Sequence, residues 1–249
     1  MAHKAIWAVV AARMTSSRLP GKVLLPLAGR PSLAHLIHRL RTSRYLNGVV
    51  VATAEGAAND PVRAFAKSEE VPVFSGSEDD VLDRTLKAAQ SVGAEVIVQV
   101  TGDCPLIDPA VVDRTIAAYL GHRPDYACNR LPETYPNGLD TEVFSTALLS
   151  QVAALTDDPS DREHVSLYIY EHPQRYTLLN VPAPPEHRWP ELRLTLDTWE
   201  DYRVIRAIFD ALFPANPDFG LTQILDWLRA HPQWVMVNHD VRQKPVRAS

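Results

Sequence analysis

The chain has 249 residues, 46% hydrophobic and 22% charged, which fits one large α/β domain and excludes extended disorder. The formal net charge of −5 and the pI near 6.0 argue against a nucleic-acid-binding protein, which usually has a basic surface. The two cysteines form no metal-binding pattern, and no apolar run approaches the roughly 18 residues of a membrane span. With no signal-peptide pattern, we expect a cytoplasmic protein without nucleic-acid or membrane partners.

Short apolar runs alternate with helical patterns in the first half of the chain. Helices are expected after a Ser77–Asp80 capping box and after Asp108, an N-cap followed by proline. The alternation predicts a doubly wound α/β fold with a mostly parallel sheet, which binds ligands at the carboxyl ends of its strands. The expected strands are 5–12, 48–53, 71–74 and 95–100, and the expected helices are 31–43, 60–69, 77–90 and one from 109.

The pattern is less regular after residue 125. We interpret residues 1–249 as a single domain in which 126–190 form a smaller excursion subdomain. This excursion is expected to leave the main sheet, to return at Leu192, and to make acceptor or dimer contacts. The expected strands are 126–129, 139–144, 176–181 and 192–196, and the expected helices are 160–171, 199–212 and one over 221–228.

Residues 11–22, AARMTSSRLPGK, follow the first expected strand directly. They contain three fixed positive charges, at Arg13, Arg18 and Lys22, together with hydroxyl groups and a flexible Pro-Gly pair. A loop of this kind can wrap a triphosphate with backbone N–H groups while its cations neutralise charge. The sequence is not a Walker A loop, and a solvated basic loop is the alternative.

Two acidic residues follow expected strands at the ligand-binding edge. Asp103 in TGDCPLID follows the strand at 95–100, and Asp197 in LTLDTWED follows the strand at 192–196. Carboxylates in such places can hold Mg²⁺ against a phosphate, because hard cations prefer oxygen ligands. The alternatives are a turn residue for Asp103 and a solvated helix-start acid for Asp197. Thr198 and Asp201 can form a capping box, which leaves Asp197 free.

Together, the segments ARMTSSRLPGK, TGDCPLIDP and LRLTLDTWED resemble the cytidylyltransferase family, which includes 3-deoxy-manno-octulosonate and acylneuraminate cytidylyltransferases. Five further segments are most similar to the branch of the spore-coat polysaccharide protein SpsF. These are PLAGRPSLAHLIHRL, VVATAE, FSGSEDDVLDR, YPNGLDTEVF and REHVSLYIY. The resemblance extends from about residue 6 to residue 212, in the expected order.

The resemblance implies a nucleotide-diphospho-sugar transferase-like fold, commonly dimeric, that uses CTP and Mg²⁺. Carried over by motif, the catalytic residues would be Arg13, Lys22, Asp103 and Asp197. The two cations would stabilise the leaving pyrophosphate, and the two carboxylates would hold the metal. The nucleotide would be bound by Ala11, Ala12, Arg13, Ser17, Arg18, Lys22, Gly76, Ser77, Asp80, Arg84, Thr101 and Asp103.

The same resemblance places five residues at the acceptor pocket: Asp140, Glu142, Arg162, Glu163 and His164. Asp140 and Glu142 alternate on an expected strand and so point to one face, where they could bind hydroxyls or a cationic group, or meet water. Glu163 also fits a capping box with Ser160, and His164 alone is typical of a packed or solvated helix residue.

The expected reaction is in-line attack of an acceptor oxygen on the α-phosphorus of CTP, with release of pyrophosphate. The acceptor would be a small sugar acid, phosphate or phosphonate. A sugar-1-phosphate nucleotidyltransferase that uses another base stays open, because base selectivity usually rests on backbone contacts. A glycosyltransferase would need a D-x-D metal motif, which is missing at the fourth expected strand. A non-catalytic nucleotide-binding protein would not need both Asp103 and Asp197 beside the cationic loop.

Overall fold

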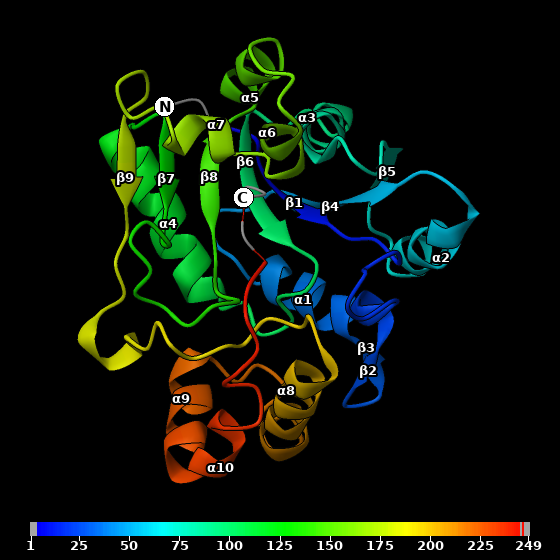
Figure 1. The fold of residues 1–249 in the computed structure, drawn as a ribbon, viewed down its shortest axis with the longest axis vertical. Helices are drawn as coiled ribbons and strands as arrows, with labels where there is room; N and C mark the ends of the chain where they lie inside the picture. Colours follow the sequence, from blue (N-terminus) through cyan, green and yellow to red (C-terminus); the bar gives the residue numbers. More distant parts are fainter. Residues whose placement is uncertain (1–3, 245, 247–249) are drawn as a thin grey trace.

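The computed structural model describes residues 4–244 and 246 of the chain. A seven-stranded sheet with the strand order β5-β4-β1-β6-β8-β7-β9 forms its centre (Figure 1). The strands are β1 (Ile6–Ala11), β4 (Gly48–Ala54), β5 (Val73–Gly76), β6 (Val96–Thr101), β7 (Tyr126–Cys128), β8 (Glu142–Ser145) and β9 (Leu178–Asn180). A small antiparallel hairpin of β2 (Pro26–Leu27) and β3 (Arg30–Pro31) lies apart from the sheet.

The four strands β5, β4, β1 and β6 are parallel, as the alternating sequence pattern predicts. The chain runs outward from β1 through β4 to β5 and then returns to the other side of β1 with β6. The strand order therefore reverses between β1 and β6. In doubly wound sheets, ligands bind at the carboxyl ends of the strands beside such a reversal.

The segment 126–190 does not leave the sheet, so that part of our interpretation is wrong. Its strands β8, β7 and β9 extend the sheet beyond β6, with β8 antiparallel to both β6 and β7. These strands are short but fully or partly buried. The backbone groups of β8 pair with the side of β6 that would otherwise be an exposed sheet edge. The sheet is thus mostly parallel with an antiparallel insertion. Contacts of this segment with an acceptor or a second subunit stay a prediction.

Helices cover both faces of the sheet, and alternate residues of β1 show this division. Ala8 and Val10 pack in a core with α1 (Ser32–Arg41), α2 (Asp60–Ser68) and α4 (Pro109–His122), whereas Val9 packs with α3 (Val81–Ser91), α5 (Thr146–Ala153) and α7 (Leu167–Tyr170). A third core joins the hairpin to α8 (Trp199–Leu212) and α9 (Leu221–Ala230), which Figure 1 shows below the sheet with α10 (Pro232–Val235).

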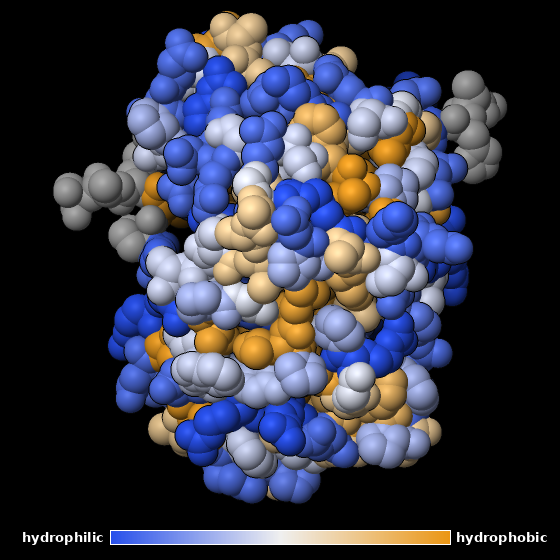
Figure 2. Space-filling view, turned by 90° about the vertical axis from the view of Figure 1, so that its right-hand side faces the viewer, coloured by the Kyte–Doolittle hydropathy of each residue, from blue (hydrophilic) through white to orange (hydrophobic). Residues whose placement is uncertain are grey.

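The face at the β5 end of the sheet is mostly hydrophilic, with scattered apolar areas (Figure 2). Within the described residues, no helix is long and apolar enough to cross a bilayer. Short 3₁₀ segments of the described chain are η1 (Lys22–Leu24), η2 (Ala57–Asn59) and η3 (Pro185–His187).

Three local predictions from the sequence are wrong. Helix α3 begins after Asp80, whose carboxylate accepts a hydrogen bond from the Asp83 amide, so Ser77 is not its N-cap. The helix expected over 160–171 is two short helices, α6 (Pro159–Glu163) and α7, and the N-cap of α6 is Asp158. Residues 192–196 form only an isolated bridge, because their backbone pairs with separate loops at Asn137 and Asp103.

Gly138 holds the loop before β8 against the segment that leads to Asp197. Its φ of +103° is in the region that favours glycine, and an added Cβ would lie 2.7 Å from backbone atoms of Leu194 and Thr195. A side chain here would therefore strain the backbone and push the two segments apart.

We predict that Gly138→Ala lowers the free energy of unfolding by about 1–3 kcal/mol, the scale of one strained backbone position. Gly121→Ala is the matched control, because Gly121 lies within α4 and a Cβ there meets open space. Alanine should leave stability there unchanged or raise it by about 0.5–1 kcal/mol. Denaturant unfolding of both variants is the measurement. Equal stability of Gly138→Ala and the wild type would contradict the prediction.

Candidate active site

The loops that follow β1 and β6 lie in direct contact. Ala11 and Thr101 are opposite each other at the ends of the two strands, and the Gly102 amide donates to the Ala11 carbonyl at 2.8 Å. A Cβ on Gly102 would lie 2.8 Å from the Ala12 Cβ, so only glycine allows this approach. The sequence places the cations on one of these loops and Asp103 on the other.

The loop after β1 turns back on itself before it reaches Lys22. Gly21 has a φ of +74°, and its amide donates to the Met14 carbonyl at 2.8 Å. The Met14 amide in turn donates to the Asn59 side chain at 2.8 Å. This closed loop brings Lys22 back beneath the carboxyl ends of the strands, where Lys22 is only 9% exposed.

The Lys22 ammonium lies between two carboxylates. Its Nζ is 2.5 Å from Asp103 Oδ2 and 2.7 Å from Asp197 Oδ1. Burial by itself would lower the pKa of Lys22, but the two opposing charges raise that pKa above its ordinary value. For Asp103 the signs are reversed. Burial by itself would raise the pKa of this carboxyl, but the charge of Lys22 holds that pKa below its ordinary value. Lys22 and Asp103 are therefore both charged at neutral pH in this arrangement.

Asp197 is held by two further cations. Arg18 approaches its Oδ1 at 2.9 Å, and Arg193 approaches its Oδ2 at 2.5 Å. Arg193 is also paired with the fully buried Asp201, whose Oδ1 lies 2.9 Å from the Arg193 Nε. The predicted Thr198–Asp201 capping box is present at the start of α8, so Asp201 fixes both the helix start and Arg193.

The sequence pattern does not reveal Arg193. It lies within the apolar run LRLTL, where an arginine side chain gives no sign of the direction in which it points. Its position four residues before Asp197 is the one available signal, since that spacing allows an ion pair on a helix. The segment is not helical, and the pair forms across a bend at Thr195 instead.

A second group of predicted residues lies beside the loop after β5. Arg13 pairs with Glu78 at 3.2 Å, and Thr15 donates a hydrogen bond to the same carboxylate. Arg84 is buried beneath this loop and donates to the backbone oxygens of Ser77 and Glu78. Arg84 thus supports the loop from inside.

Across this loop, Arg162 of α6 lies 3.3 Å from Asp80. These two residues line a surface pocket together with Arg13, Ser77 and Glu163. The pocket therefore joins residues predicted for the nucleotide to residues predicted for the acceptor.

A cavity between β6, β8 and α6 contains most of the predicted acceptor residues. Asp140 and Glu142 line it from one side, although Asp140 precedes β8 and does not lie on a strand as expected. Glu163 and His164 line it from α6 and the turn that follows. Ala11 and Thr101 also reach it, so the cavity opens beside the ends of β1 and β6.

Arg130 and Ser166 are cavity residues that our reading of the sequence missed. Arg130 NH1 lies 3.3 Å from Glu142 Oε1, and the Ser166 hydroxyl donates to Glu142 Oε2 at 2.5 Å. The negative charges of Glu142 and Asp140 outweigh burial and raise the pKa of Arg130. Burial raises the pKa of Asp140 to about 6, with a further contribution from Glu142, although the charge of Arg130 opposes the rise.

The remaining predicted residues lie at the margins of these groups. Ala12 is buried directly after β1, and Gly76 ends β5, where an added Cβ would lie 3.2 Å from the Arg84 side chain. Ser17 is exposed and accepts a hydrogen bond from Lys244. The roles assigned to all these residues towards nucleotide, metal and acceptor stay predictions.

A family model described as "Cytidylyltransferase" matches residues 7–225. The chain belongs to the cytidylyltransferase family. It is 37% identical over 235 residues to the spore coat polysaccharide biosynthesis protein SpsF of Bacillus subtilis (strain 168), covering 90% of this chain and 94% of that protein. The predicted resemblance is thereby confirmed, and the chain is a nucleotidyltransferase enzyme.

Solved structures agree with this assignment. A cytidylyltransferase from Leptospira borgpetersenii serovar Hardjo-bovis (strain JB197) superposes with a TM-score of 0.88 at 30% identity, covering 98% of this chain and 100% of that one. The structure of CMP:2-keto-3-deoxy-manno-octonic acid synthetase complexed with CTP has a TM-score of 0.63 at 19% identity, covering 83% and 99%. This second likeness supports the predicted fold class.

The raised pKa of Asp140 makes stability depend on pH. In the unfolded chain this carboxyl loses its proton near pH 4, whereas in the folded protein it keeps the proton up to about pH 6. Between these values the folded state binds more protons than the unfolded state, so this group makes stability fall as pH rises.

We predict that Asp140→Asn removes this loss, because the amide carries no charge. The melting temperature of the variant relative to the wild type should rise between pH 4 and pH 7 and then level off. Asp210→Asn, which breaks an exposed pair with Arg206 on α8, should show no such trend. Differential scanning fluorimetry across this pH range measures both. A constant difference for Asp140→Asn would contradict the prediction.

Proposed function

We propose that this cytidylyltransferase binds CTP at the loop after β1 and transfers CMP to a small acceptor in the cavity beside β8, with release of pyrophosphate. The observation that carries the proposal is the position of Lys22. Its ammonium lies at the strand-order reversal, between Asp103 and Asp197 and close to Arg18. A triphosphate placed there meets fixed cations and a carboxylate pair suited to a divalent ion.

The triphosphate would draw on cations that are already held in place. Lys22 and Arg18 can donate to phosphate oxygens, because each carries several N–H groups and only some are used by Asp103 and Asp197. Arg13 can turn from the partly exposed Glu78 towards the same anion. Positioning and charge neutralisation of the departing pyrophosphate are the main contributions that such residues make to phosphoryl chemistry.

Asp103 and Asp197 are the residues that would hold Mg²⁺. Their oxygens lie within 2.7 Å of one shared cation, the Lys22 ammonium, so both carboxylates already reach a common position. Among the described residues no group of three or more acidic, histidine or cysteine side chains surrounds a metal position, which fits an ion that takes its other ligands from phosphate and water. When bound, the ion would neutralise phosphate charge and polarise the α-phosphate.

The acceptor would enter the cavity lined by Asp140, Glu142, Glu163 and His164. Its hydroxyl groups can donate to the carboxylates, and a carboxylate or phosphate can be met by Arg130 or Arg162. A small sugar acid, a phosphate or a phosphonate fits these partners. Two names support this class of acceptor. The synthetase with the same fold is named for CMP and 2-keto-3-deoxy-manno-octonic acid, and SpsF is named for polysaccharide biosynthesis. A homodimer with contacts in 126–190 is part of the proposal.

Ligand-induced stabilisation tests the nucleotide. A ligand at 100 times its dissociation constant adds roughly 2.7 kcal/mol to stability, which for this length raises the melting temperature by about 5–10 °C. We expect this rise for CTP with Mg²⁺, and smaller shifts for UTP, ATP and GTP. A larger shift with another triphosphate would favour a sugar-1-phosphate nucleotidyltransferase of another base. A folded sample that responds to no triphosphate would refute the proposal.

Catalysis is tested at Asp103. We predict that Asp103→Ala lowers kcat for pyrophosphate release by at least about 10²-fold, the scale of one lost preorganised charge. Asp103→Asn should lose a similar factor, because it keeps the size of the side chain and removes its charge. The control Asp210→Ala, on the exposed face of α8, should leave kcat unchanged. Turnover of Asp103→Ala close to that of the wild type would remove Asp103 from the mechanism.

A further inference from the structure

The chain returns to the active site after its last helix. We call residues 238–246 the C-terminal strap, of which the structure describes 238–244 and 246. Figure 1 shows it running from α10 back towards β6 and β8. Its first residue, Asn238, is buried, and its amide group donates to the Arg193 carbonyl at 3.1 Å and to Asp201 Oδ1 at 2.9 Å. The strap is therefore anchored to the same residues that fix Asp197.

Three successive strap residues then contact the loop after β1 and Arg193. The Arg242 carbonyl accepts from Arg18 NH1 at 3.2 Å, and Gln243 Oε1 accepts from Arg193 NH1 at 2.8 Å. Lys244 Nζ donates to Ser17 Oγ at 2.7 Å. Val246, further along, lines the cavity that contains Asp140 and Glu142.

The charges around Lys22 are already balanced. Lys22, Arg18 and Arg193 provide three positive charges, and these pair with the carboxylates of Asp103, Asp197 and Asp201. Arg13, at the margin, is paired with Glu78. A triphosphate that enters this region brings several negative charges without a matching excess of protein cations.

Lys244 is placed to supply part of that excess. Its ammonium is exposed and its hydrogen-bond partner is the uncharged hydroxyl of Ser17. No carboxylate of the described residues forms an ion pair with it. An ammonium has three donors, so two directions remain for phosphate oxygens beside Ser17.

We propose that Lys244 is a nucleotide-binding residue: the strap carries it to the loop after β1, where its ammonium binds the triphosphate next to Ser17. The inference rests on the proposed function, because it needs a triphosphate at this loop. The family model ends at residue 225, before the strap begins, so the family match assigns no role to this segment.

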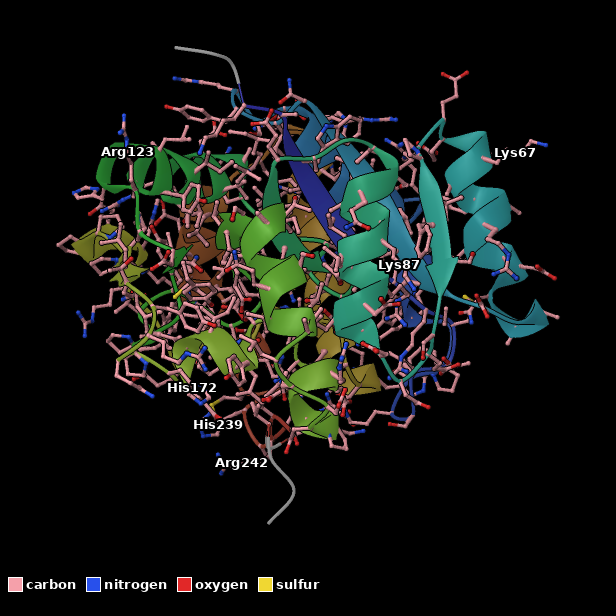
Figure 3. The ribbon with its side chains drawn as sticks, turned by 90° about the horizontal axis from the view of Figure 1, so that it is seen from above. Lys67, Lys87, Arg123, His172, His239 and Arg242 are labelled. Atoms are coloured by element: carbon pink, nitrogen blue, oxygen red, sulfur yellow. The ribbon has the colours of Figure 1, made fainter. Side chains whose placement is uncertain are left out.

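The test compares three point variants and one truncated chain with the wild type. Lys244→Ala removes the charge, Lys244→Arg keeps it, and a stop after Val241 removes the strap beyond its anchor. Lys67→Ala is the matched control, because Lys67 is an exposed lysine on α2, far from Arg242 of the strap in Figure 3. Isothermal titration with CTP and Mg²⁺ gives the dissociation constant of each protein.

We expect Lys244→Ala to weaken CTP binding by about 5- to 20-fold, as for one charge-assisted hydrogen bond at a partly solvated site. Lys244→Arg should stay within about twofold of the wild type, and the truncated chain should lose at least as much as Lys244→Ala. Lys67→Ala should bind as the wild type does. Unchanged melting temperatures without ligand would show that the variants fold.

Several results would overturn the inference. If the wild type binds CTP and Lys244→Ala binds it equally well, the Lys244 assignment is wrong while the proposed function stands. A loss in the truncated chain alone would mean that the strap acts without the Lys244 charge, which also refutes the assignment. If the wild type prefers another triphosphate, CTP specificity fails, and binding of that nucleotide by Lys244→Ala as tightly as by the wild type overturns the Lys244 assignment. A wild type that binds no triphosphate refutes both.

Discussion

The Lys22 ammonium between Asp103 and Asp197 is the interaction on which the candidate active site depends. The three residues come from loops separated by 81 and 94 positions in the sequence, and each loop has its own support. Gly21 and Asn59 close the first loop, Gly102 fits the second against it, and Asp201 fixes the third. Removing any one partner would leave a partly buried charge uncompensated, which is costly in a protein interior.

The same interaction depends on the position of α8, which packs with α9 and the hairpin below the sheet. Asp197 lies just before α8, so the helix must be fixed in position for the carboxylate to reach Lys22. Asp201 does this in two ways, since it caps α8 and also neutralises Arg193. The apolar core that α8 shares with the hairpin and α9 then holds the whole element. The charges that fix α8 and the charges that surround Lys22 are therefore parts of one network.

Much of this arrangement follows from the sequence, because the parallel half obeys simple patterns. Short apolar runs followed by cationic or acidic loops are enough to locate Arg13, Lys22 and Asp103 at one edge of the sheet. The antiparallel half could not be predicted in this way. Its strands have only three or four residues, too few for a clear periodicity, and their place beside β6 is set by tertiary packing. Arg193 and Arg130 could not be predicted as site residues, because the sequence does not show where a long side chain in an apolar or proline-rich segment points.

The antiparallel pairing of β6 with β8 has a consequence for how the enzyme can diversify. Because β8 runs against β6, its first residue, Glu142, lies opposite Gln99, close to where β6 ends. The parallel strands β1 and β6 thus end at the same edge of the sheet at which the antiparallel strand β8 begins. Substitutions in the reversed strand and its neighbours can remodel one half of this edge while the loops around Lys22 keep their geometry. If the acceptor binds beside β8 as we propose, a scaffold built like this can change its acceptor through substitutions in a short stretch of chain and keep its nucleotide.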